Sequence, residues 1–434
     1  MADTNTGADW DVVVVGAGAA GLVAAERAAQ RGRRTLLLEK SRKPGVKILM
    51  SGGTRCNLTH ATDAQGIVAA YGPPGRFLHS ALAALSPQDL VALVEREGVA
   101  TKIEPTGKIF PASDKATDVL AAFLARLRRT QCQLALGEAL LSLVPNGDGF
   151  QLTTSLRCLT AARVIVTTGG QSYPGCGTTG DGFRWAVELG HRLVPPRPAL
   201  VPVTTGDAWV RALQGVTIPD VAVRVIEPPS TSRSLPTNGD APSGRAGKSA
   251  CLDVRRGSFL FTHFGLSGPV ILDCSRAVSG HPRPQSLSLE CDFLPDVSEA
   301  AIDASLHAAA SGAGKKQLIA ILPEALPRRL CEALLAQAAL TPESKAAELS
   351  RTGRARLAQA IKRTRIAISG TRGFAKAEVT AGGVALDEVD SRTLQSKLVP
   401  HLYWAGEVLD LDGPIGGFNF QAAFSTGWLA GESA

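Results

Sequence analysis

The sequence feature that most constrains the fold is a glycine-rich turn between an apolar run and an alanine-rich segment. Val12–Val15 is wholly apolar and β-branched, which predicts a strand buried on both faces of a sheet. The turn Gly16-Ala17-Gly18-Ala19-Ala20-Gly21 follows at once, and the alanines of Leu22–Gln30 predict a helix. A strand, a GxGxxG turn and a helix in this order are typical of the start of a dinucleotide-binding domain.

The three glycines of this turn have different expected roles. Gly16 permits the tight turn, Gly18 lets a pyrophosphate approach the backbone, and Gly21 lets the helix pack on the strand. Glu39 lies 18 residues after Gly21, at the end of a second predicted strand, Thr35–Leu38. Its carboxylate can accept hydrogen bonds from an adenosine ribose and disfavours a 2′-phosphate there. We therefore expect a bound dinucleotide, against the alternative of a glycine turn without a ligand.

The C-terminal segment indicates which dinucleotide binds. Leu402–Ala405 predicts a strand, Gly406-Glu407 a turn, and Gly416-Gly417-Phe418-Asn419 leads into a helix from about Phe420. The positive N-terminus of such a helix stabilises a flavin whose N1–C2=O edge becomes anionic on reduction. Flavoproteins often return their C-terminus to the domain that their N-terminus begins, so we predict FAD; the alternative is a capped terminal helix. No second GxGxxG indicates a dedicated nicotinamide domain.

The distribution of charge and the spacing of the cysteines bear on three further classes of site: nucleic-acid-binding surfaces, metal sites and redox-active thiols. Lys and Arg outnumber Asp and Glu by 46 to 39, and the segment 315–365 holds eleven bases against four acids. This local excess is either a solvated helical surface or a surface that binds RNA or a protein partner, and we expect the solvated surface. The eight cysteines include no CxxC pair and the histidines no HxxH pair, so we expect no metal site and reduced, mostly buried thiols.

Seven stretches between residues 11 and 431 match the motifs of a known family: DVVVVGAGAAGL, GVKILMSGGTRCNLTH, TTGGQSYPGCGTTGDGF, HRLVPPRPALVPV, FTHFGLSGPVILD, AEVTAGGVALDEVD and LYWAGEVLDLDGPIGGFNFQAAFSTGWLAG. In these stretches the chain resembles the bacterial FAD-dependent oxidoreductases related to aminoacetone oxidase and to the bile-acid 3-dehydro-4,6-dienoyl reductase. The resemblance implies non-covalent FAD, a β-barrel-like insertion and a further helical module.

The expected fold class is α/β, with a Rossmann-like FAD-binding domain built from both chain ends, an inserted antiparallel β-barrel-like domain and a helical module. Prolines at 195, 196, 198 and 202 mark the start of the insertion, where short alternating segments predict antiparallel strands. We expect the N-terminal part of the FAD-binding domain over 1–195 and the β-rich substrate domain over 196–295. The basic helical module is expected over 296–366, and a return to the β-rich and FAD-binding domains over 367–434.

The resemblance also implies which residues hold the cofactor. The glycine turn and Glu39 are assigned to the ADP half, Lys47 and the loop 51–57 to the pyrophosphate and flavin, and Glu407 to the ribityl hydroxyls. Within that loop Arg55 could offset phosphate charge. The full set is Gly16, Gly18, Ala20, Gly21, Glu39, Lys40, Lys47, Ser51, Gly52, Gly53, Arg55, Cys56, Asn57, Ala139, Leu140, Thr168, Gly169, Gly170, Gly180, Asp181, Gly406, Glu407, Gly416, Gly417, Asn419 and Phe420.

Tyr173 and His263 are the candidate proton donors in these motifs, although for each a merely structural hydrogen bond is an equal alternative. Cys56 has no second thiol nearby, so we interpret it as a packed loop thiol rather than half of a redox pair.

Together the sequence predicts an FAD-dependent oxidoreductase that transfers hydride through flavin N5. We favour NAD(P)H-linked reduction of a small electron-poor substrate; the alternatives are an oxidase that uses O₂ on an amine-type substrate and a flavin-bearing protein that binds RNA or a partner. Met1–Trp10 carries two acids and no base, and no apolar run reaches the ~18 residues of a membrane span. We therefore expect a cytoplasmic protein without a membrane span, and leave the substrate and oligomeric state open.

Overall fold

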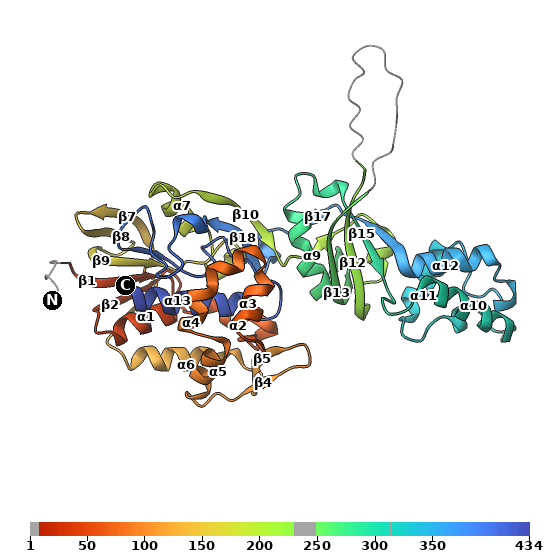
Figure 1. Ribbon diagram of the computed structural model, residues 1–434, viewed down its shortest axis with the longest axis horizontal. Coiled ribbons are helices and arrows are strands. Elements are labelled where there is room, and N and C mark those ends of the chain that lie inside the picture. The colour runs from red at the N-terminus through yellow and green to blue at the C-terminus, as the bar shows by residue number, and fades with distance from the viewer. Residues whose placement is uncertain (1–7, 230–248, 313) are drawn as a thin grey trace, which may run out of the picture. The chain divides into compact units, whose positions relative to one another are not determined.

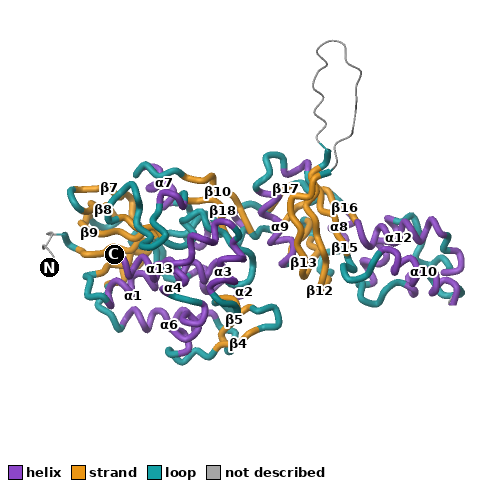
Figure 2. Tube along the Cα trace, viewed as in Figure 1, coloured by secondary structure: helices purple, strands orange, loops and turns teal. Residues whose placement is uncertain are grey.

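The computed structural model describes residues 8–229, 249–312 and 314–434, which form two compact units. The first unit joins the described residues up to Pro198 with Ala377–Ala434, and the second comprises Ala199–Lys376 (Figures 1 and 2). The prediction that both chain ends build one Rossmann-like domain is thereby confirmed. The finer division of the chain at residues 195, 295 and 366 stays a prediction.

Seven strands form the central sheet of the first unit: β1 (Trp10–Val15), β2 (Thr35–Glu39), β6 (Gln133–Leu136), β7 (Leu140–Asn146), β8 (Gly149–Thr154), β9 (Cys158–Val166) and β19 (Leu402–Trp404). Their order is β6-β2-β1-β9-β8-β7, with β19 pairing β9 beside this path. The pairs that join β6, β2, β1, β9 and β19 are parallel, as in a doubly wound fold. Val12, Val13 and Val14 are fully buried, as a central parallel strand requires.

The two chain ends meet where helix α1 (Ala19–Gln30) packs against helix α13 (Phe418–Ser433) (Figure 1). Two glycines of α13 allow this close approach. A Cβ on Gly427 would lie 2.2 Å from the carbonyl oxygen of Ala20, and one on Gly431 would lie 2.3 Å from that of Ala24. Because only glycine leaves room for the facing backbone, the C-terminal helix is fitted to the helix that follows the glycine turn.

The rest of the first unit surrounds this core. Its other helices are α2 (Val46–Thr54), α3 (Ala64–Tyr71), α4 (His79–Ala84), α5 (Pro87–Glu95), α6 (Ala116–Arg128) and α7 (Asp181–Glu188). Two small sheets complete it, one with β4 (Thr101–Ile103) and β3 (Thr59–His60) on either side of β5 (Lys108–Pro111), the other pairing β10 (Leu193–Ala199) with β18 (Val379–Val384). Within α2 the backbone leaves the helical region at Ser51, Gly52 and Gly53, so this stretch contains a kink.

The second unit contains a seven-stranded sheet of β11 (Val203–Thr204), β12 (Thr217–Glu227), β13 (Ala250–Thr262), β14 (Gly265–Ser267), β15 (Ser288–Asp292), β16 (Thr364–Ala367) and β17 (Gly370–Thr371). The order is β16-β15-β12-β13-β14-β11-β17 with antiparallel neighbours, as predicted for the insertion. The expected barrel-like closure is not confirmed. A barrel needs a hydrogen-bonded ladder between its edge strands, and the described residues show none between β16 and β17.

Helices α8 (Ala208–Ala212), α9 (Pro269–Ser279), α10 (Glu299–Gly312), α11 (Arg328–Gln337) and α12 (Arg351–Arg363) complete the second unit. Strands and helices share one hydrophobic core, in which Phe259 and Phe261 of β13 belong to the same cluster as Leu330 of α11 and Leu357 of α12.

In the described ranges no single helix has the length and apolar character to cross a bilayer. Only the bent pair Pro73–Ala84 and Pro87–Glu95 meets that requirement, and only when both halves are taken together.

Candidate cofactor site

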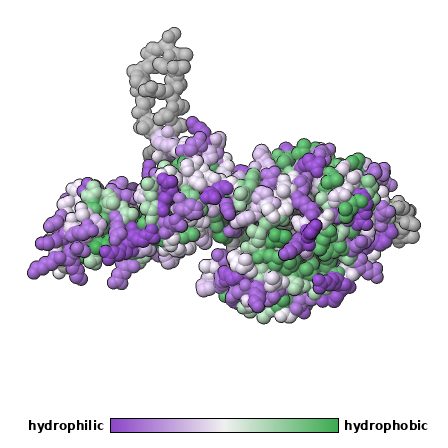
Figure 3. All heavy atoms as spheres, turned by 180° about the vertical axis from the view of Figure 1, so that it is seen from behind, coloured by the Kyte–Doolittle hydropathy of each residue, from purple (hydrophilic) through white to green (hydrophobic). Residues whose placement is uncertain are grey.

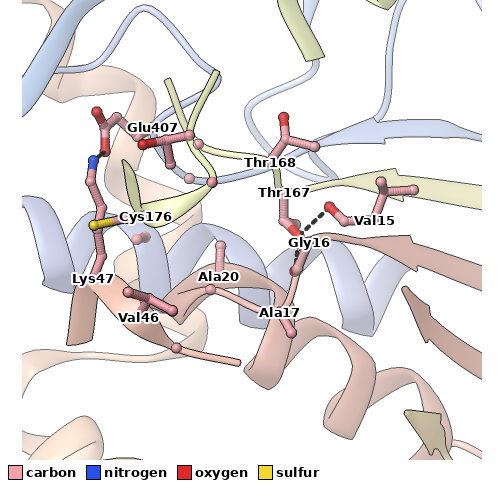
Figure 4. A pocket seen from close by; sticks show the side chains of 18 of the residues that line it. Val15, Gly16, Ala17, Ala20, Val46, Lys47, Thr167, Thr168, Cys176 and Glu407 are labelled. Carbon is pink, nitrogen blue, oxygen red and sulfur yellow. Dashed lines mark hydrogen bonds and ion pairs between the residues drawn. The ribbon is translucent and has the colours of Figure 1, made fainter. Parts of the chain in front are cut away.

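A pocket in the first unit lies at the carboxyl ends of β1, β2 and β9 (Figure 4). Ligands of doubly wound folds bind at this edge of the sheet, where the loops after the strands converge. Fourteen of the residues assigned to the cofactor line the pocket: Gly16, Gly18, Ala20, Glu39, Lys40, Lys47, Leu140, Thr168, Gly169, Asp181, Gly406, Glu407, Asn419 and Phe420. The structure thus brings together segments that are up to about 400 residues apart.

The glycine turn shows a separate steric reason for each glycine. Gly16 has φ +103°, and a Cβ there would lie 2.8 Å from the carbonyl oxygen of Thr167. A Cβ on Gly21 would lie only 1.8 Å from the carbonyl oxygen of Gly16, so α1 packs directly on the turn. Gly18 differs from both, because no atom lies within 4 Å of its Cβ position. The middle glycine therefore faces open space on the pocket side.

Glu39 has a second task besides the one predicted. Its Oε2 accepts the N–H of Ala17 at 2.8 Å, and its Oε1 accepts the N–H of Ser41 at 2.8 Å. The carboxylate thus fixes the glycine turn from the end of β2. Each carboxylate oxygen has a second lone pair, so this role leaves Glu39 able to accept a hydroxyl as well.

Lys47 and Glu407 form an ion pair at the other side of the pocket. Lys47 Nζ lies 2.7 Å from Glu407 Oε2 and donates to Ser172 Oγ at 2.6 Å. Glu407 Oε1 accepts the hydroxyl of Ser172 at 2.7 Å and the N–H of Thr380 at 2.8 Å. In Figure 4 this pair and Cys176 lie away from Gly16, Ala17 and Thr167, so the pocket has two differently built ends.

Lys40 and Asp181 are paired with each other. Lys40 Nζ lies 2.6 Å from Asp181 Oδ2 and 2.6 Å from the hydroxyl of Thr179. The pair joins the residue after β2 to the first residue of α7, so two predicted site residues hold the pocket wall together.

The other predicted cofactor residues do not line the pocket: Gly21, Ser51, Gly52, Gly53, Arg55, Cys56, Asn57, Ala139, Gly170, Gly180, Gly416 and Gly417. Two of these glycines lie in close contact with side chains of neighbouring segments. A Cβ on Gly170 would lie 2.3 Å from Thr380 Oγ1, and one on Gly180 would lie 2.6 Å from Gln171 Nε2. These glycines therefore let neighbouring segments approach one another.

The loop 51–57 differs most from expectation. Arg55 Nη1 lies 2.6 Å from Glu104 Oε1 and 3.5 Å from Asp114 Oδ1, and its guanidinium lies 4.0 Å from the ring centre of Phe110. Its charge is therefore balanced by two carboxylates rather than left for a phosphate. Cys56 is fully buried, and burial raises the pKa of its thiol to about 12, which agrees with a packed rather than a reactive thiol.

The C-terminal turn is held by Asn419. Its Oδ1 accepts the N–H of Gly413 at 2.8 Å, and its Nδ2 donates to the carbonyl oxygen of Gly413 at 3.0 Å. Gly417 is the N-cap residue of α13 and has φ +95°. Since glycine has no side chain, it makes no capping hydrogen bond to the first N–H groups of the helix. Asn419 and Phe420 then enter the pocket lining from the first turn of α13.

The two candidate proton donors lie in different units. Tyr173 is half-buried in the loop before Cys176, and burial, together with the negative charge of Glu378, raises the pKa of its phenol. It does not itself line the pocket, but Cys176 and Glu378 do. His263 is exposed in the turn between β13 and β14, where its ring packs against that of Phe264. Its assignment as a proton donor stays a prediction.

Sequence reasoning missed several lining residues: Lys43, Val46, Cys176, Thr178, Trp185, Glu378, Val379, Leu411, Ala422, Ala423 and Thr426. Spacing could have found one group, because Ala422, Ala423 and Thr426 follow Asn419 at the 3–4-residue intervals of one helix face. Thr426 Oγ1 accepts the N–H of Gly406 at 3.0 Å and so fixes the turn before Glu407. In the described residues no group of three or more His, Cys, Asp or Glu side chains could hold a metal ion.

The comparisons with known proteins agree with this geometry. The family described as HI0933-like protein Rossmann domain matches residues 10–433. Two relatives are named ribosomal RNA dihydrouridine synthase. The one from Escherichia coli K12 is 32% identical to this chain, and the match covers 98% of this chain and 97% of the relative. The one from Haemophilus influenzae is 31% identical, and the match covers 97% of both chains. A relative from Clostridium scindens named 3-dehydro-bile acid delta(4,6)-reductase is 30% identical over 97% of this chain and 98% of its own.

Fold and family together define an FAD-dependent oxidoreductase with a Rossmann-type cofactor domain. The chain belongs to the HI0933-like family, as the resemblance noted in the sequence predicted.

The residues at the glycine turn fit FAD. Gly18 leaves open space for a pyrophosphate, and α1 begins there with no side-chain cap and no acidic residue in its first turn. The positive helix N-terminus can therefore serve phosphate oxygens. Accordingly, the turn from Gly16 to Gly18 would hold the pyrophosphate, and Glu39 the adenosine ribose.

Proposed function

We propose that the protein is an FAD-dependent reductase that saturates a C=C bond conjugated to a carbonyl, with uridine in ribosomal RNA as its substrate. The supporting observation is that two relatives named ribosomal RNA dihydrouridine synthase match this chain almost end to end in both directions. Dihydrouridine is uridine reduced across C5=C6. The balanced reaction is uridine plus NAD(P)H plus a proton, giving 5,6-dihydrouridine and NAD(P)⁺.

Bound FAD would supply hydride transfer at N5 in this reaction. The chain contributes binding and proton chemistry. Lys47 and Glu407 line the pocket as an ion pair, and Ser172 accepts from the ammonium and donates to the carboxylate, which fixes both side chains in position. Tyr173 is the candidate proton donor of the first unit, because it precedes the pocket-lining Cys176 by three residues and its phenol is protonated at neutral pH.

A second candidate substrate is a small conjugated ketone. The bile-acid relative supports it, since a delta(4,6)-reductase acts on the same bond type and is 30% identical to this chain. The chemistry is shared by both candidates, so only the substrate distinguishes them.

The test begins with anaerobic mixing of the holoenzyme with NADH or NADPH. Bleaching of the flavin absorbance is expected with at least one of them; a flavin that stays oxidised with both would contradict the nicotinamide-linked reductase. Fast reduction by an amine with reoxidation by O₂ would favour the oxidase instead. Next, unmodified ribosomal RNA and a 3-keto-4,6-diene steroid are each incubated with enzyme and NAD(P)H. A gain of two hydrogens on a uridine identifies the RNA reaction, and turnover of the steroid alone would identify the second candidate.

A further inference from the structure

We propose that five exposed cations of the second unit form an RNA-binding surface, here called the cationic surface: Lys315, Lys316, Lys345, Arg351 and Arg356. The choice of RNA as partner rests on the proposed function. The identity of the residues rests on which bases of the segment 315–365 are engaged by protein groups and which are not.

Six of the eleven bases in this segment are engaged by the protein. Lys362 lies 2.6 Å from Asp292, and Arg354 lies 3.1 Å from Asp303. Arg328, Arg363 and Arg365 pair with Glu332, Glu299 and Glu290 at 3.0, 3.4 and 3.3 Å. Arg329 donates to two backbone carbonyls, those of Ala212 and Gln214. Four of these side chains link a helix to another element, Arg365 links β16 to β15, and Arg328 pairs within its own helix α11.

The five cations of the cationic surface differ from this group. All five are exposed, and among the described residues none makes an ion pair or side-chain hydrogen bond. A Lys or Arg that balances no carboxylate adds its full charge to the surface and is available to an external anion. Within the same stretches, 314–318 and 343–356, only Glu343 and Glu348 are unpaired acids, which leaves an excess of three positive charges.

Backbone pairing gathers three of the five cations. The N–H of Ala346 donates to the carbonyl oxygen of Lys316 at 2.8 Å, and Gln317 and Lys345 form an antiparallel bridge. The stretch with Lys315 and Lys316 therefore lies beside the stretch with Lys345. Arg351 and Arg356 follow on α12, which is buried through other positions, Gly353, Leu357, Ala358 and Ile361. Figure 3 shows hydrophilic side chains over the part of the second unit that Figure 1 labels α10, α11 and α12.

The composition of the segment indicates how it would bind RNA. The stretches 314–318 and 343–356, which carry the five cations, contain no Phe, Tyr, Trp or His, so they offer no aromatic ring on which an unpaired base could stack. Lys and Arg without aromatic partners contact phosphates, and such contacts fix position and orientation without reading sequence. The cationic surface would therefore hold a folded RNA through its phosphate backbone without selecting a base.

The test compares two triple variants of the holoenzyme that remove the same charge. The first is K315Q/K316Q/K345Q, from the cationic surface. The matched control is R328Q/R363Q/R365Q, whose three cations are exposed but paired. Retention of flavin absorbance by both variants serves as the check of folding. Binding to a ribosomal RNA fragment is measured by fluorescence anisotropy between about 50 and 200 mM KCl.

Wild type is expected to lose affinity as salt rises, with a log–log slope between about −3.5 and −4.5, from roughly −0.7 per phosphate in single strands to roughly −0.9 in a duplex for five phosphates. The first variant should reduce the magnitude of the slope by about 2 and bind more weakly, while the control variant should stay within about 0.5 of wild type. Equal weakening in both variants would mean that net charge alone matters, and no change in the first variant would mean that RNA binds elsewhere. Either result overturns the cationic surface.

The two proposals can fail separately. If the first variant loses RNA binding but the enzyme forms no dihydrouridine in ribosomal RNA, the cationic surface stands and the proposed substrate is wrong. If dihydrouridine forms and the first variant binds RNA like wild type, the substrate stands and the cationic surface is wrong.

Discussion

The ammonium nitrogen of Lys47 lies 2.7 Å from Oε2 of Glu407, although 360 residues separate them in the sequence. Lys47 belongs to α2, and Glu407 follows the strand β19 that the C-terminal segment adds to the central sheet. Their side chains are only 24% and 18% exposed, so each charge depends on the other for compensation. The pocket is therefore completed only when the C-terminal segment has docked.

Replacing Lys47 by Met should destabilise the first unit and weaken FAD retention together. Glu407 would lose a charge-assisted hydrogen bond worth roughly 1.5–3 kcal/mol while it stays half-buried. Glu407→Gln should cost less than this, because the amide can still accept from Ser172 and the Thr380 N–H. Urea unfolding of the two single variants and the double variant measures the coupling of the pair, expected at about 0.5–3 kcal/mol. Strictly additive effects would contradict the ion pair.

Gly18→Ala and Gly21→Ala should separate cofactor binding from folding. Gly18 has φ −82° and no neighbour near its Cβ position, so alanine fits the apoprotein but projects toward the pocket. We expect apo stability within about 0.5 kcal/mol of wild type and FAD affinity reduced at least about tenfold. Gly21→Ala places a Cβ against the Gly16 carbonyl and should destabilise the apoprotein by about 1–3 kcal/mol.

Calorimetry of the apoproteins and flavin titration measure the two effects. The separation would be contradicted if Gly18→Ala bound FAD normally, or if both variants lost the same stability before FAD is added.

The strand and helix elements around the glycine turn were predictable because their signals are local. The β-branched run before Gly16 and the alanines after Gly21 each specify one element, and β1 and α1 extend the predicted segments by only a few residues. For the region 44–155 the sequence predicted no individual strand or helix. Its short helices and two-to-four-residue strands, such as β3 and β4, are fixed by tertiary packing rather than by a periodic pattern.

A site residue could be predicted where the backbone conformation of a turn requires glycine. It could not be predicted where the role of a charged side chain depends on its ion-pair partners. Gly16 and Gly18 could be assigned from the turn that they must form. Arg55 could not, because the carboxylates that engage it, Glu104 and Asp114, lie about 50 to 60 residues further along the chain. A sequence shows that a charge is present, but only the fold shows whether a neighbour has already neutralised it.

His191 should make stability depend on pH below neutrality. Its Nε2 accepts the indole N–H of Trp404 at 3.2 Å, and its Nδ1 faces Glu388 Oε2 at 3.2 Å. The neutral ring with the proton on Nδ1 satisfies both contacts, and burial lowers the pKa of the imidazole. A histidine that is harder to protonate when folded binds more protons when unfolded. Stability should therefore fall as the pH decreases from about 6.5 toward the folded-state pKa.

His191→Gln should flatten this part of the stability profile, although it also loses hydrogen bonds and is less stable at neutral pH. Urea unfolding at pH values from about 7.5 to 5 measures the slope. The control is His79→Gln, which removes an exposed imidazole. If His79→Gln flattens the profile as much as His191→Gln, or if neither does, the buried imidazole is not the source of the dependence.

Arg126→Met should be among the most destabilising single changes in the first unit. Arg126 of α6 forms a bidentate salt bridge with Glu26 of α1, with Nε 3.1 Å from Oε2 and Nη2 2.5 Å from Oε1. Glu26 is 1% exposed, so losing the guanidinium leaves a buried carboxylate without a counter-charge, at a cost of about 3–5 kcal/mol. Arg129→Met is the control, because that side chain is 59% exposed and should cost no more than about 1 kcal/mol.

The pH dependence of this variant gives a second readout. Burial already raises the pKa of Glu26, and without Arg126 the folded state should favour its protonated form further. A carboxyl with a raised folded-state pKa contributes stability below its unfolded pKa, near 4.3, and loses it as the pH rises through the folded value. The penalty of Arg126→Met should therefore shrink as urea unfolding is repeated at decreasing pH, and Glu26→Gln combined with Arg126→Met should recover part of it at neutral pH. A penalty that is constant with pH and unchanged in the double variant would show that Arg126 acts through packing of its stem alone.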